Sequence, residues 1–416
     1  MRPTPLFLSV RLGQSAVEKE TRRKRMPLPL EGTRVLDLSQ VLPGGLCTQI
    51  LADLGADVIK IENPKGGDGF RKSPPQMGNT GSFFLVINRN KRSMTLNMHE
   101  EEGRAILRRM IPEADVFVEN FRPGTMGRWG LDYEAVREIN PSLVYCSLSG
   151  FGQDGPYSQK PAHDLNILAI SGILDLLGER GRRPIVPAVQ IAGAGGAILA
   201  ALGILAALLR RSLCGSGQYL DVSLLDGLSP YLGLIMSEFA VRGSAPGRGE
   251  ARVGGGYACY NVYETKDGRC IALGCLEEKF WESFCRAIRR DDLAGDLLAP
   301  LDRQAEIIAE LRTVFLQRTR GEWVDLLDRF DVCFSTVNSL DEVLDDPQVH
   351  HRGLWFRAQQ PGNGEILQQA FPIKFSGEQP GWRTPPPALG EHTDDLLESM
   401  LIDAPARTSL RDRGII

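Results

Sequence analysis

Residues Thr33 to Glu62 read TRVLDLSQVLPGGLCTQILADLGADVIKIE, and this stretch sets the class of the fold. Its first part, Thr33 to Leu38, is an apolar run of residues that favour strands. Pro43-Gly44-Gly45 then turns the chain into a helical pattern, and Ala56 to Glu62 reads as a second strand. A strand, a helix and a strand in this order predict parallel strands joined by a crossover helix.

The same alternation repeats as far as Ser147. Strand patterns occupy Ser93 to Leu96, Val116 to Glu119 and Leu143 to Ser147, with helical patterns at Glu101 to Ile111 and Tyr133 to Ile139. We therefore expect an α/β protein with a Rossmann-like large domain, whose sites lie at the carboxyl ends of the strands. The chain has no GxGxxG motif, so NAD binding is not expected.

The composition changes after Val241. Arg242 to Gly256 is rich in Gly, Arg and Pro, and a hairpin signal follows around Lys266-Asp267-Gly268. We predict a second, smaller α+β domain beyond this linker. The expected segments are a disordered or misassigned extension (1–27), the large domain (28–241), a linker (242–253), the small domain (254–329) and a C-terminal segment that returns to the large domain (330–416).

Charge and composition exclude several classes of partner. The net charge of -4 gives no reason to expect nucleic acid. The eight scattered cysteines lack a CxxC pair and indicate a reducing cytoplasm, and the five histidines lack the spacing of metal ligands. The uncharged run Ile185 to Leu209 is long enough to span a membrane. However, Pro187 and a predicted turn at Gly193 to Gly196 shorten the helical part, which favours a buried core helix.

Several motifs resemble those of the family III (CaiB/BaiF) CoA-transferases. They include Asn88-Arg89-Asn90-Lys91-Arg92-Ser93, Glu119-Asn120-Phe121-Arg122-Pro123-Gly124, Ser149-Gly150-Phe151-Gly152 and Gly390-Glu391-His392-Thr393. The resemblance runs from about Leu28 to the C-terminal end. It implies a CoA thioester and a carboxylic acid as substrates, no permanently bound cofactor, and an interlocked homodimer or heterodimer.

The resemblance also implies which residues bind CoA. The candidates are Val41, Leu42, Asn88, Lys91, Asn120, Phe121, Arg122 and Arg128. Lys91, Arg92, Arg122 and Arg128 carry the cationic groups that bind phosphate and pyrophosphate, and Asn120-Phe121 would line the adenine pocket. The alternative is that some of these cations only solvate the surface.

Two further stretches resemble the α-methylacyl-CoA racemase branch of the family. They are His163-Asp164-Leu165-Asn166, and Gly254-Gly255-Gly256-Tyr257 followed by Leu276-Glu277. The resemblance implies that His163 is a catalytic base and that Glu277 orients it. An imidazole, with a reference pKa of about 6.5, suits a general base at neutral pH.

One departure from the family concerns the central catalytic residue. The resemblance implies an aspartate directly after Gln190-Ile191-Ala192, which is the nucleophile of the transferases and the second base of the racemases. This chain has Gly193 there, which can neither be acylated nor accept a proton.

Three hypotheses remain open. The first is CoA transfer, either as one subunit of a hetero-oligomer whose paralogue bears the aspartate, or with another carboxylate such as Glu277 or Asp164. The second is an α-methylacyl-CoA racemase or epimerase that uses His163. The third is a subunit that binds acyl-CoA without turning it over.

Overall fold

A six-stranded parallel sheet forms the centre of the large domain in the computed structural model, which describes residues 26–416. The spatial order is β5 (Lys91–Thr95), β2 (Asp57–Glu62), β1 (Arg34–Asp37), β6 (Val116–Glu119), β7 (Val144–Ser149) and β8 (Tyr219–Ser223). All neighbouring pairs are parallel, so the predicted α/β fold with a parallel sheet is confirmed. Residues 1–25 of the predicted extension lie outside the described residues.

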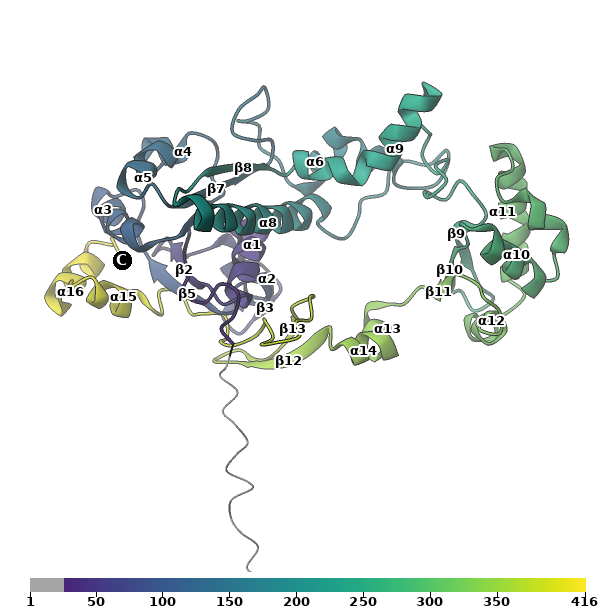
Figure 1. The fold of residues 1–416 in the computed structure, drawn as a ribbon. Helices are drawn as coiled ribbons and strands as arrows, with labels where there is room; N and C mark the ends of the chain where they lie inside the picture. Colours follow the sequence, from purple (N-terminus) through teal and green to yellow (C-terminus); the bar gives the residue numbers. More distant parts are fainter. Residues whose placement is uncertain (1–25) are drawn as a thin grey trace, which may run out of the picture.

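Helices cover both faces of this sheet (Figure 1). One face packs against α1 (Val41–Asp53) and α8 (Ile191–Cys214). The other packs against α3 (Glu101–Met110), α5 (Tyr133–Ile139), α15 (Thr393–Ser399) and α16 (Ala404–Asp412). Successive residues of one strand serve the two faces, since Val35 belongs to the first cluster and Leu36 to the second. This double burial explains the continuous apolar runs in the strands.

The glycines of α8 correct one prediction. The expected turn at Gly193 to Gly196 is wrong, because α8 runs unbroken for 24 residues from Ile191 to Cys214. A Cβ on Gly196 would lie 2.2 Å from Cδ2 of Leu224, so glycine here permits close packing. By length and composition α8 is apolar enough to cross a membrane, but half of its apolar window is buried inside the protein. That burial favours the expected core helix.

The small domain has its own sheet and core. Its antiparallel strands are β11 (Phe334–Thr336), β10 (Cys270–Gly274) and β9 (Tyr260–Glu264), in that order. The predicted hairpin is confirmed, because Thr265 N donates to Arg269 O between β9 and β10. Helices α10 (Glu278–Ala287), α11 (Leu301–Phe315) and α12 (Arg320–Leu327) cover one face of this sheet, with Trp281, Phe315 and Trp323 buried beneath them.

The chain leaves the large domain by one route and returns by another, so the ribbon forms an open ring (Figure 1). It departs through α9 (Ser229–Arg242) and comes back through α13 (Leu340–Asp345), α14 (Pro347–Arg352) and the hairpin of β12 (Trp355–Gln360) and β13 (Gly364–Gln369). Gln368 Nε2 donates to Leu85 O (2.9 Å), which ties the hairpin to α2 (Ser82–Ile87). The shorter elements are β3 (Gln76–Met77), β4 (Thr80–Gly81), α4 (Thr125–Arg128), α6 (Asp164–Ser171) and α7 (Ile173–Leu176).

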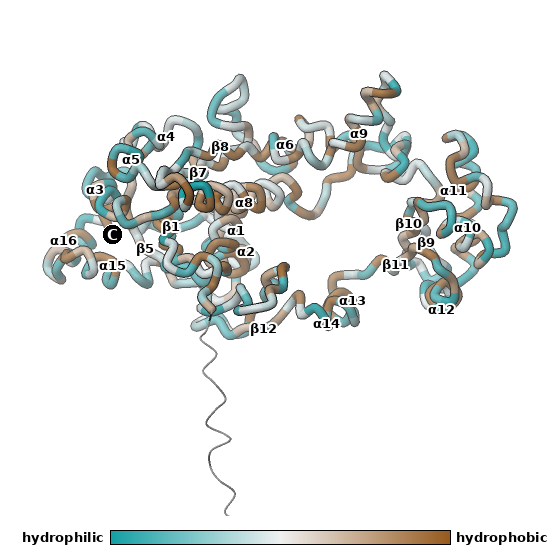
Figure 2. Tube along the Cα trace, in the orientation of Figure 1, coloured by the Kyte–Doolittle hydropathy of each residue, from teal (hydrophilic) through white to brown (hydrophobic). Residues whose placement is uncertain are grey.

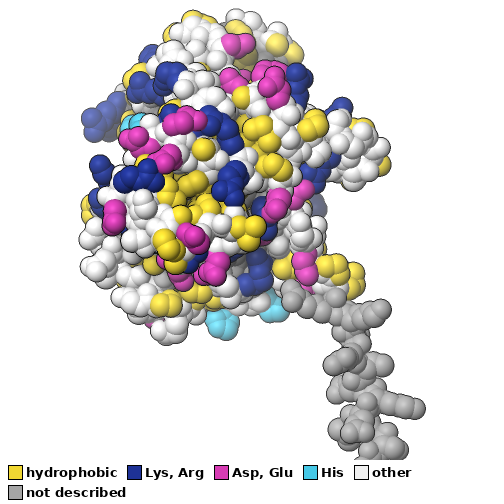
Figure 3. Space-filling model, turned by 90° about the vertical axis from the view of Figure 1, so that its left-hand side faces the viewer, with side chains coloured by type: hydrophobic (Ala, Val, Ile, Leu, Met, Phe, Trp, Pro, Cys, Tyr) yellow, Lys and Arg dark blue, Asp and Glu magenta, His cyan; other side chains and the backbone are white. Residues whose placement is uncertain are grey.

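The surface differs between the end of the large domain and the ring. Around α3, α15 and α16, side chains of both charges are interspersed, and pairs such as Arg413–Glu102 (2.5 Å) join them (Figure 3). By contrast, apolar residues follow α8 and α9 (Figure 2). Leu213 of α8 and Val241 of α9 are 84% and 86% exposed. Apolar surface of this extent is typical of an interface.

Candidate active site

The strand order reverses between β1 and β6, and ligands of such sheets bind outside the carboxyl ends at this point. The loops that follow these two strands are joined here. Asn120 Oδ1 accepts from Gln40 N (2.8 Å), and Asn120 Nδ2 donates to Gln40 O (2.7 Å). The structure therefore brings the start of α1, with Val41 and Leu42, to the loop containing Phe121 and Arg122.

Two cations stand at the surface beside these loops. Arg122 and Arg128 are both exposed, and Arg128 Nη2 donates to Thr125 Oγ1 (3.0 Å). Phe121 meets Trp129 edge to face, with 5.1 Å between ring centroids, which holds the loop over α4. Both guanidinium groups are thus exposed to solvent in the segment that follows the carboxyl end of β6.

Lys91 and Asn88 do not reach this surface, which corrects their predicted role. Both side chains are buried, and Lys91 Nζ donates to Thr48 Oγ1 (2.7 Å), Asn88 Oδ1 (2.8 Å), Gly45 O (2.9 Å) and Asp37 Oδ2 (3.2 Å). Burial lowers the pKa of Lys91 to about 8, although Asp37 opposes the shift. These contacts use the ammonium donors inside the fold and leave none for a phosphate.

Arg92 is likewise committed elsewhere. Its Nε and Nη2 donate to the two carboxylate oxygens of Asp57 (2.8 and 2.6 Å). Asp57 is the first residue of β2, so the pair lies at the amino end of the sheet. The structure therefore places Arg92 at the edge opposite to the loops of Val41 and Asn120.

A buried charge network supports the first turn of α1. Lys60 Nζ lies 3.0 Å from Asp68 Oδ2, and Asp68 Oδ2 accepts from Val41 N (3.1 Å). Burial opposes ionisation of Asp37, but Lys60 and Lys91 outweigh it and hold its pKa below the usual value. The network fixes Val41, whose φ of 55° is unusual for a branched residue. The sequence signal for this network is the presence of charged residues, Asp37 and Lys60, within otherwise apolar strands.

The start of α8 lies against the first turn of α1. Asp164 accepts from Gly193 N (2.8 Å) and from Ile191 N (3.3 Å), so its carboxylate satisfies orphan donors of this helix. A Cβ on Gly193 would lie 3.3 Å from Leu42 Cδ2 and 3.7 Å from Asp164 Oδ1. Position 193 is thus set between the predicted CoA loop and Asp164.

His163 and Glu277 are both exposed, but one chain does not bring them together. His163 precedes α6, and its N donates to Asn166 Oδ1 (2.9 Å). Glu277 precedes α10, which lies in the small domain on the far side of the ring (Figure 1). Pairing of the two side chains would need a second chain.

One known protein family matches most of the chain. A sequence model described as CoA-transferase family III matches residues 30–393. The chain belongs to CoA-transferase family III. This establishes the resemblance inferred from the motifs, and it makes a CoA thioester the substrate that the family implies.

Relatives of this family III chain carry two kinds of activity. It is 31% identical to the human succinyl-CoA:glutarate CoA-transferase, over 93% of this chain and 90% of that protein. It is 32% identical to the human alpha-methylacyl-CoA racemase, over 89% of this chain and 93% of that protein. A CAIB/BAIF family protein from Brucella suis has a similar structure, with a TM-score of 0.79, 31% identity, and coverage of 90% of this chain and all of that one.

Sequence reasoning missed one titratable group that lies beside Arg122. Glu119 ends β6, is 3% exposed, and lines a hollow of about 350 Å³ that also contacts Arg122. Its Oε2 accepts from Phe121 N (2.8 Å). Burial raises the pKa of Glu119 to about 7 and Asp221 adds to the shift, while hydrogen bonds from Ser147 and Phe121 N oppose it.

The Glu119→Gln variant should reveal this carboxyl in stability measurements. Because the pKa in the folded protein is raised from 4.5 to about 7, its contribution to stability is complete below pH 4.5 and is lost as the pH rises through 7. Between about pH 5 and pH 8, unfolding of the native chain should become easier by roughly 2–3 kcal/mol relative to the variant. Urea unfolding of both proteins across this range measures the difference, and parallel pH curves would contradict the assignment.

Proposed function

We propose that this chain binds an acyl-CoA at the loops after β1 and β6 and takes part in transfer of CoA to a carboxylic acid, as one subunit of an assembly. The observation that carries the proposal is the position of Gly193, which adjoins Leu42 and Asp164. The exposed Arg122 and Arg128 support binding of the phosphates. The subunit role follows from the chemistry that position 193 lacks.

Transfer of CoA through the enzyme needs a carboxylate that can be acylated. The carboxylate attacks the thioester carbonyl, CoA thiolate leaves, and a mixed anhydride forms. Attack of the thiolate on the enzyme's carbonyl then releases the acid and leaves an enzyme-CoA thioester, from which a second acid accepts CoA. Gly193 cannot supply this carboxylate.

Asp164 is the nearest carboxylate to position 193, but its environment disfavours nucleophilic attack. The N–H groups of Ile191 and Gly193 each donate to one of its two oxygens at the start of a long helix. Both oxygens are therefore engaged in capping α8, and attack on a thioester would have to break one of these hydrogen bonds. We therefore favour an aspartate on a paralogous partner chain.

The apolar face of the ring supports assembly with a second chain. α9 has no buried residue, and Leu202, Leu209 and Leu213 of α8 are exposed along one side. A partner that covers this surface can bring its Glu277 towards His163, and the open ring fits the interlocked dimer that the resemblance implies. The partner is either a second copy or the paralogue with the aspartate.

Mass spectrometry after incubation with acyl-CoAs tests the proposal, with and without a co-expressed paralogue. We expect a CoA or acyl adduct on the partner's aspartate, and at least a tenfold loss of CoA affinity in Arg122→Ala, since a charge-assisted hydrogen bond is lost. Arg92→Ala is the matched control, because Arg92 faces the other end of the sheet. An adduct on Asp164 or Glu277 would instead locate the chemistry in this chain.

A racemase or epimerase is the second candidate, and the exposed His163 at the start of α6 favours it. A base there can remove the proton from Cα of a 2-methylacyl-CoA. Incorporation of solvent deuterium at Cα, without any enzyme adduct, would select this function and exclude transfer. Binding of acyl-CoA with neither result would leave a non-catalytic subunit.

A further inference from the structure

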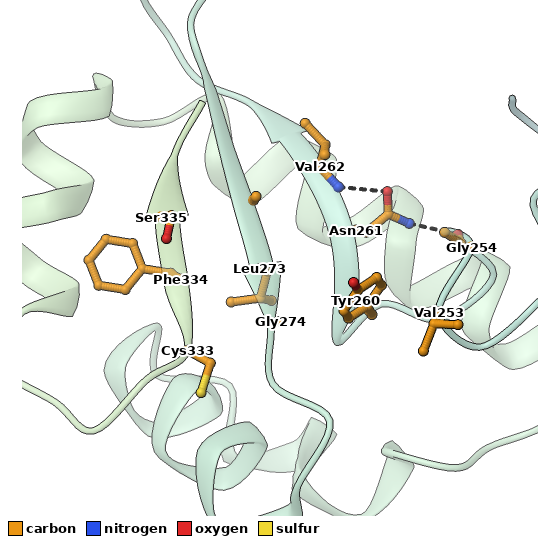
Figure 4. A pocket seen from close by; sticks show the side chains of 12 residues that line it. Val253, Gly254, Tyr260, Asn261, Val262, Leu273, Gly274, Cys333, Phe334 and Ser335 are labelled. Atoms are coloured by element: carbon orange, nitrogen blue, oxygen red, sulfur yellow. Dashed lines mark hydrogen bonds between the residues drawn. The ribbon is translucent and has the colours of Figure 1, made fainter. Parts of the chain in front are cut away.

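A groove lies along the small domain's sheet, on the face opposite to the one that α10, α11 and α12 cover. Its volume is about 590 Å³, within the range of small-molecule sites. Apolar side chains from three segments line it, namely Val253, Tyr260, Val262 and Ala272, and Figure 4 labels Val253, Tyr260 and Val262. Val262 is 54% exposed although it lies within a strand, so the groove presents apolar surface to whatever occupies it.

The groove adjoins two segments that belong to the predicted site. One wall is the loop of Gly254 and Gly255, where Asn261 Nδ2 donates to Gly255 O (2.8 Å). Another is β10, whose last residue, Gly274, is followed three positions later by Glu277. An acyl group attached to CoA near Glu277 would therefore have this groove as its apolar neighbour.

The residues that line the groove include no charged side chain. Arg252 precedes them in the sequence but is not among the lining residues, and its Nη2 donates to Leu276 O (2.9 Å). Burial of an ionised carboxylate without a cation is costly, so a second carboxylate on the acyl group would find no partner here.

A neighbouring hollow of about 830 Å³ on the other side of the glycine loop does not supply the missing charge. Arg180 there pairs with Glu250 (2.8 Å), and Arg312 lies 3.9 Å from Glu179. Glu264 also lines this hollow, so acidic groups outnumber basic ones. Neither hollow offers an unbalanced positive charge to a dicarboxylic acyl group.

We infer that the groove takes the acyl part of the CoA thioester and that this part is uncharged and apolar, so the substrate is a monocarboxylic acyl-CoA. The inference rests on the proposed function, because it assumes that Glu277 lies at the reacting thioester. It also sets this chain apart from its human relative, which is named for succinyl-CoA and glutarate, both dicarboxylic.

Calorimetric titration of the purified assembly with a matched series tests the inference. The probes are CoA, acetyl-CoA, butyryl-CoA, hexanoyl-CoA and succinyl-CoA. Each added methylene should raise affinity roughly threefold, as expected for burial of apolar surface. Butyryl-CoA and succinyl-CoA have the same chain length and differ in a terminal methyl or carboxylate. Butyryl-CoA should bind at least tenfold more tightly.

Ser335→Arg places a cation in the groove and should reverse this preference. The ratio of the affinity for succinyl-CoA to the affinity for butyryl-CoA should rise at least tenfold. Ser335 is exposed on β11 and lines the groove. Gln348→Arg adds the same charge at an exposed position of α14 and should leave the preference unchanged.

The outcomes separate this inference from the proposed function. Failure of CoA itself to bind would overturn both. Equal affinity for CoA, butyryl-CoA and succinyl-CoA would overturn only the inference that the groove binds the acyl group. A change in sedimentation of Ser335→Arg without any change in acyl preference would show that the groove is a protein interface, which also overturns the inference.

Discussion

Gly193→Asp is expected to give this chain an enzyme-CoA thioester of its own and to raise its rate of CoA transfer at least about a hundredfold. The new side chain would start between Leu42 and Asp164. Its Cβ would lie 3.3 Å from Cδ2 of Leu42. This contact is tight, but the leucine side chain is flexible and can move. The backbone at position 193 is ordinary helix, so the variant should fold.

The measurement is mass spectrometry of the peptide containing residue 193 after incubation with an acyl-CoA and an acceptor acid. Gly193→Ala adds the same Cβ without a carboxylate and should form no adduct. Gly203→Asp puts a carboxylate elsewhere on α8, at a position where a Cβ has room, and should also remain inactive. If Gly193→Asp binds CoA normally but forms no adduct, the assignment of position 193 as the site of the missing nucleophile is wrong.

Asp37→Ala is expected to destabilise the protein by about 3–5 kcal/mol, because it leaves buried positive charge uncompensated. Lys91 Nζ lies 3.2 Å and Lys60 Nζ 4.0 Å from Asp37 Oδ2, and all three side chains are fully buried. Urea unfolding measures the change. The paired substitution Asp37→Ala with Lys91→Met should recover part of the loss, since it removes one of the stranded charges.

Asp57→Ala provides the comparison for this prediction. Asp57 also meets two cations, Arg34 and Arg92, but its side chain is 34% exposed. Removal of an exposed pair typically costs no more than about 1 kcal/mol. If Asp37→Ala costs as little as Asp57→Ala, then the buried network does not stabilise the first turn of α1.

The strands and most helices of the large domain could be predicted because local pattern determines them. Val116 to Glu119 and Tyr133 to Ile139 have the predicted limits, since an apolar run and an amphipathic helix each leave a regular signature. The family motifs also indicated the loops of Asn120 and Arg122. The structure shows that these loops meet the one that follows β1.

Residues whose role depends on depth could not be assigned in this way. Lys91 belongs to a basic motif that predicts an exposed position, yet its long side chain is buried and its Nζ donates to Asp37. Gly193 to Gly196 read as a turn, because no local signal tells a glycine that breaks a helix from one that lets a helix approach Leu224. The separation of His163 from Glu277 depends on the path of the whole ring.

The path of the chain around the ring constrains the order in which its parts can fold during synthesis. Asn97 N donates to Ile415 O (2.7 Å), and Asn90 Oδ1 accepts from Arg383 N (2.7 Å), so the edge of the central sheet is completed by nearly the last residues of the chain. During synthesis, the small domain leaves the ribosome before these residues do. The large domain therefore stays unfinished until residues 383–415 have been made, and contacts of such long sequence separation form slowly. During that interval the two connections of the ring are not yet joined at the central sheet.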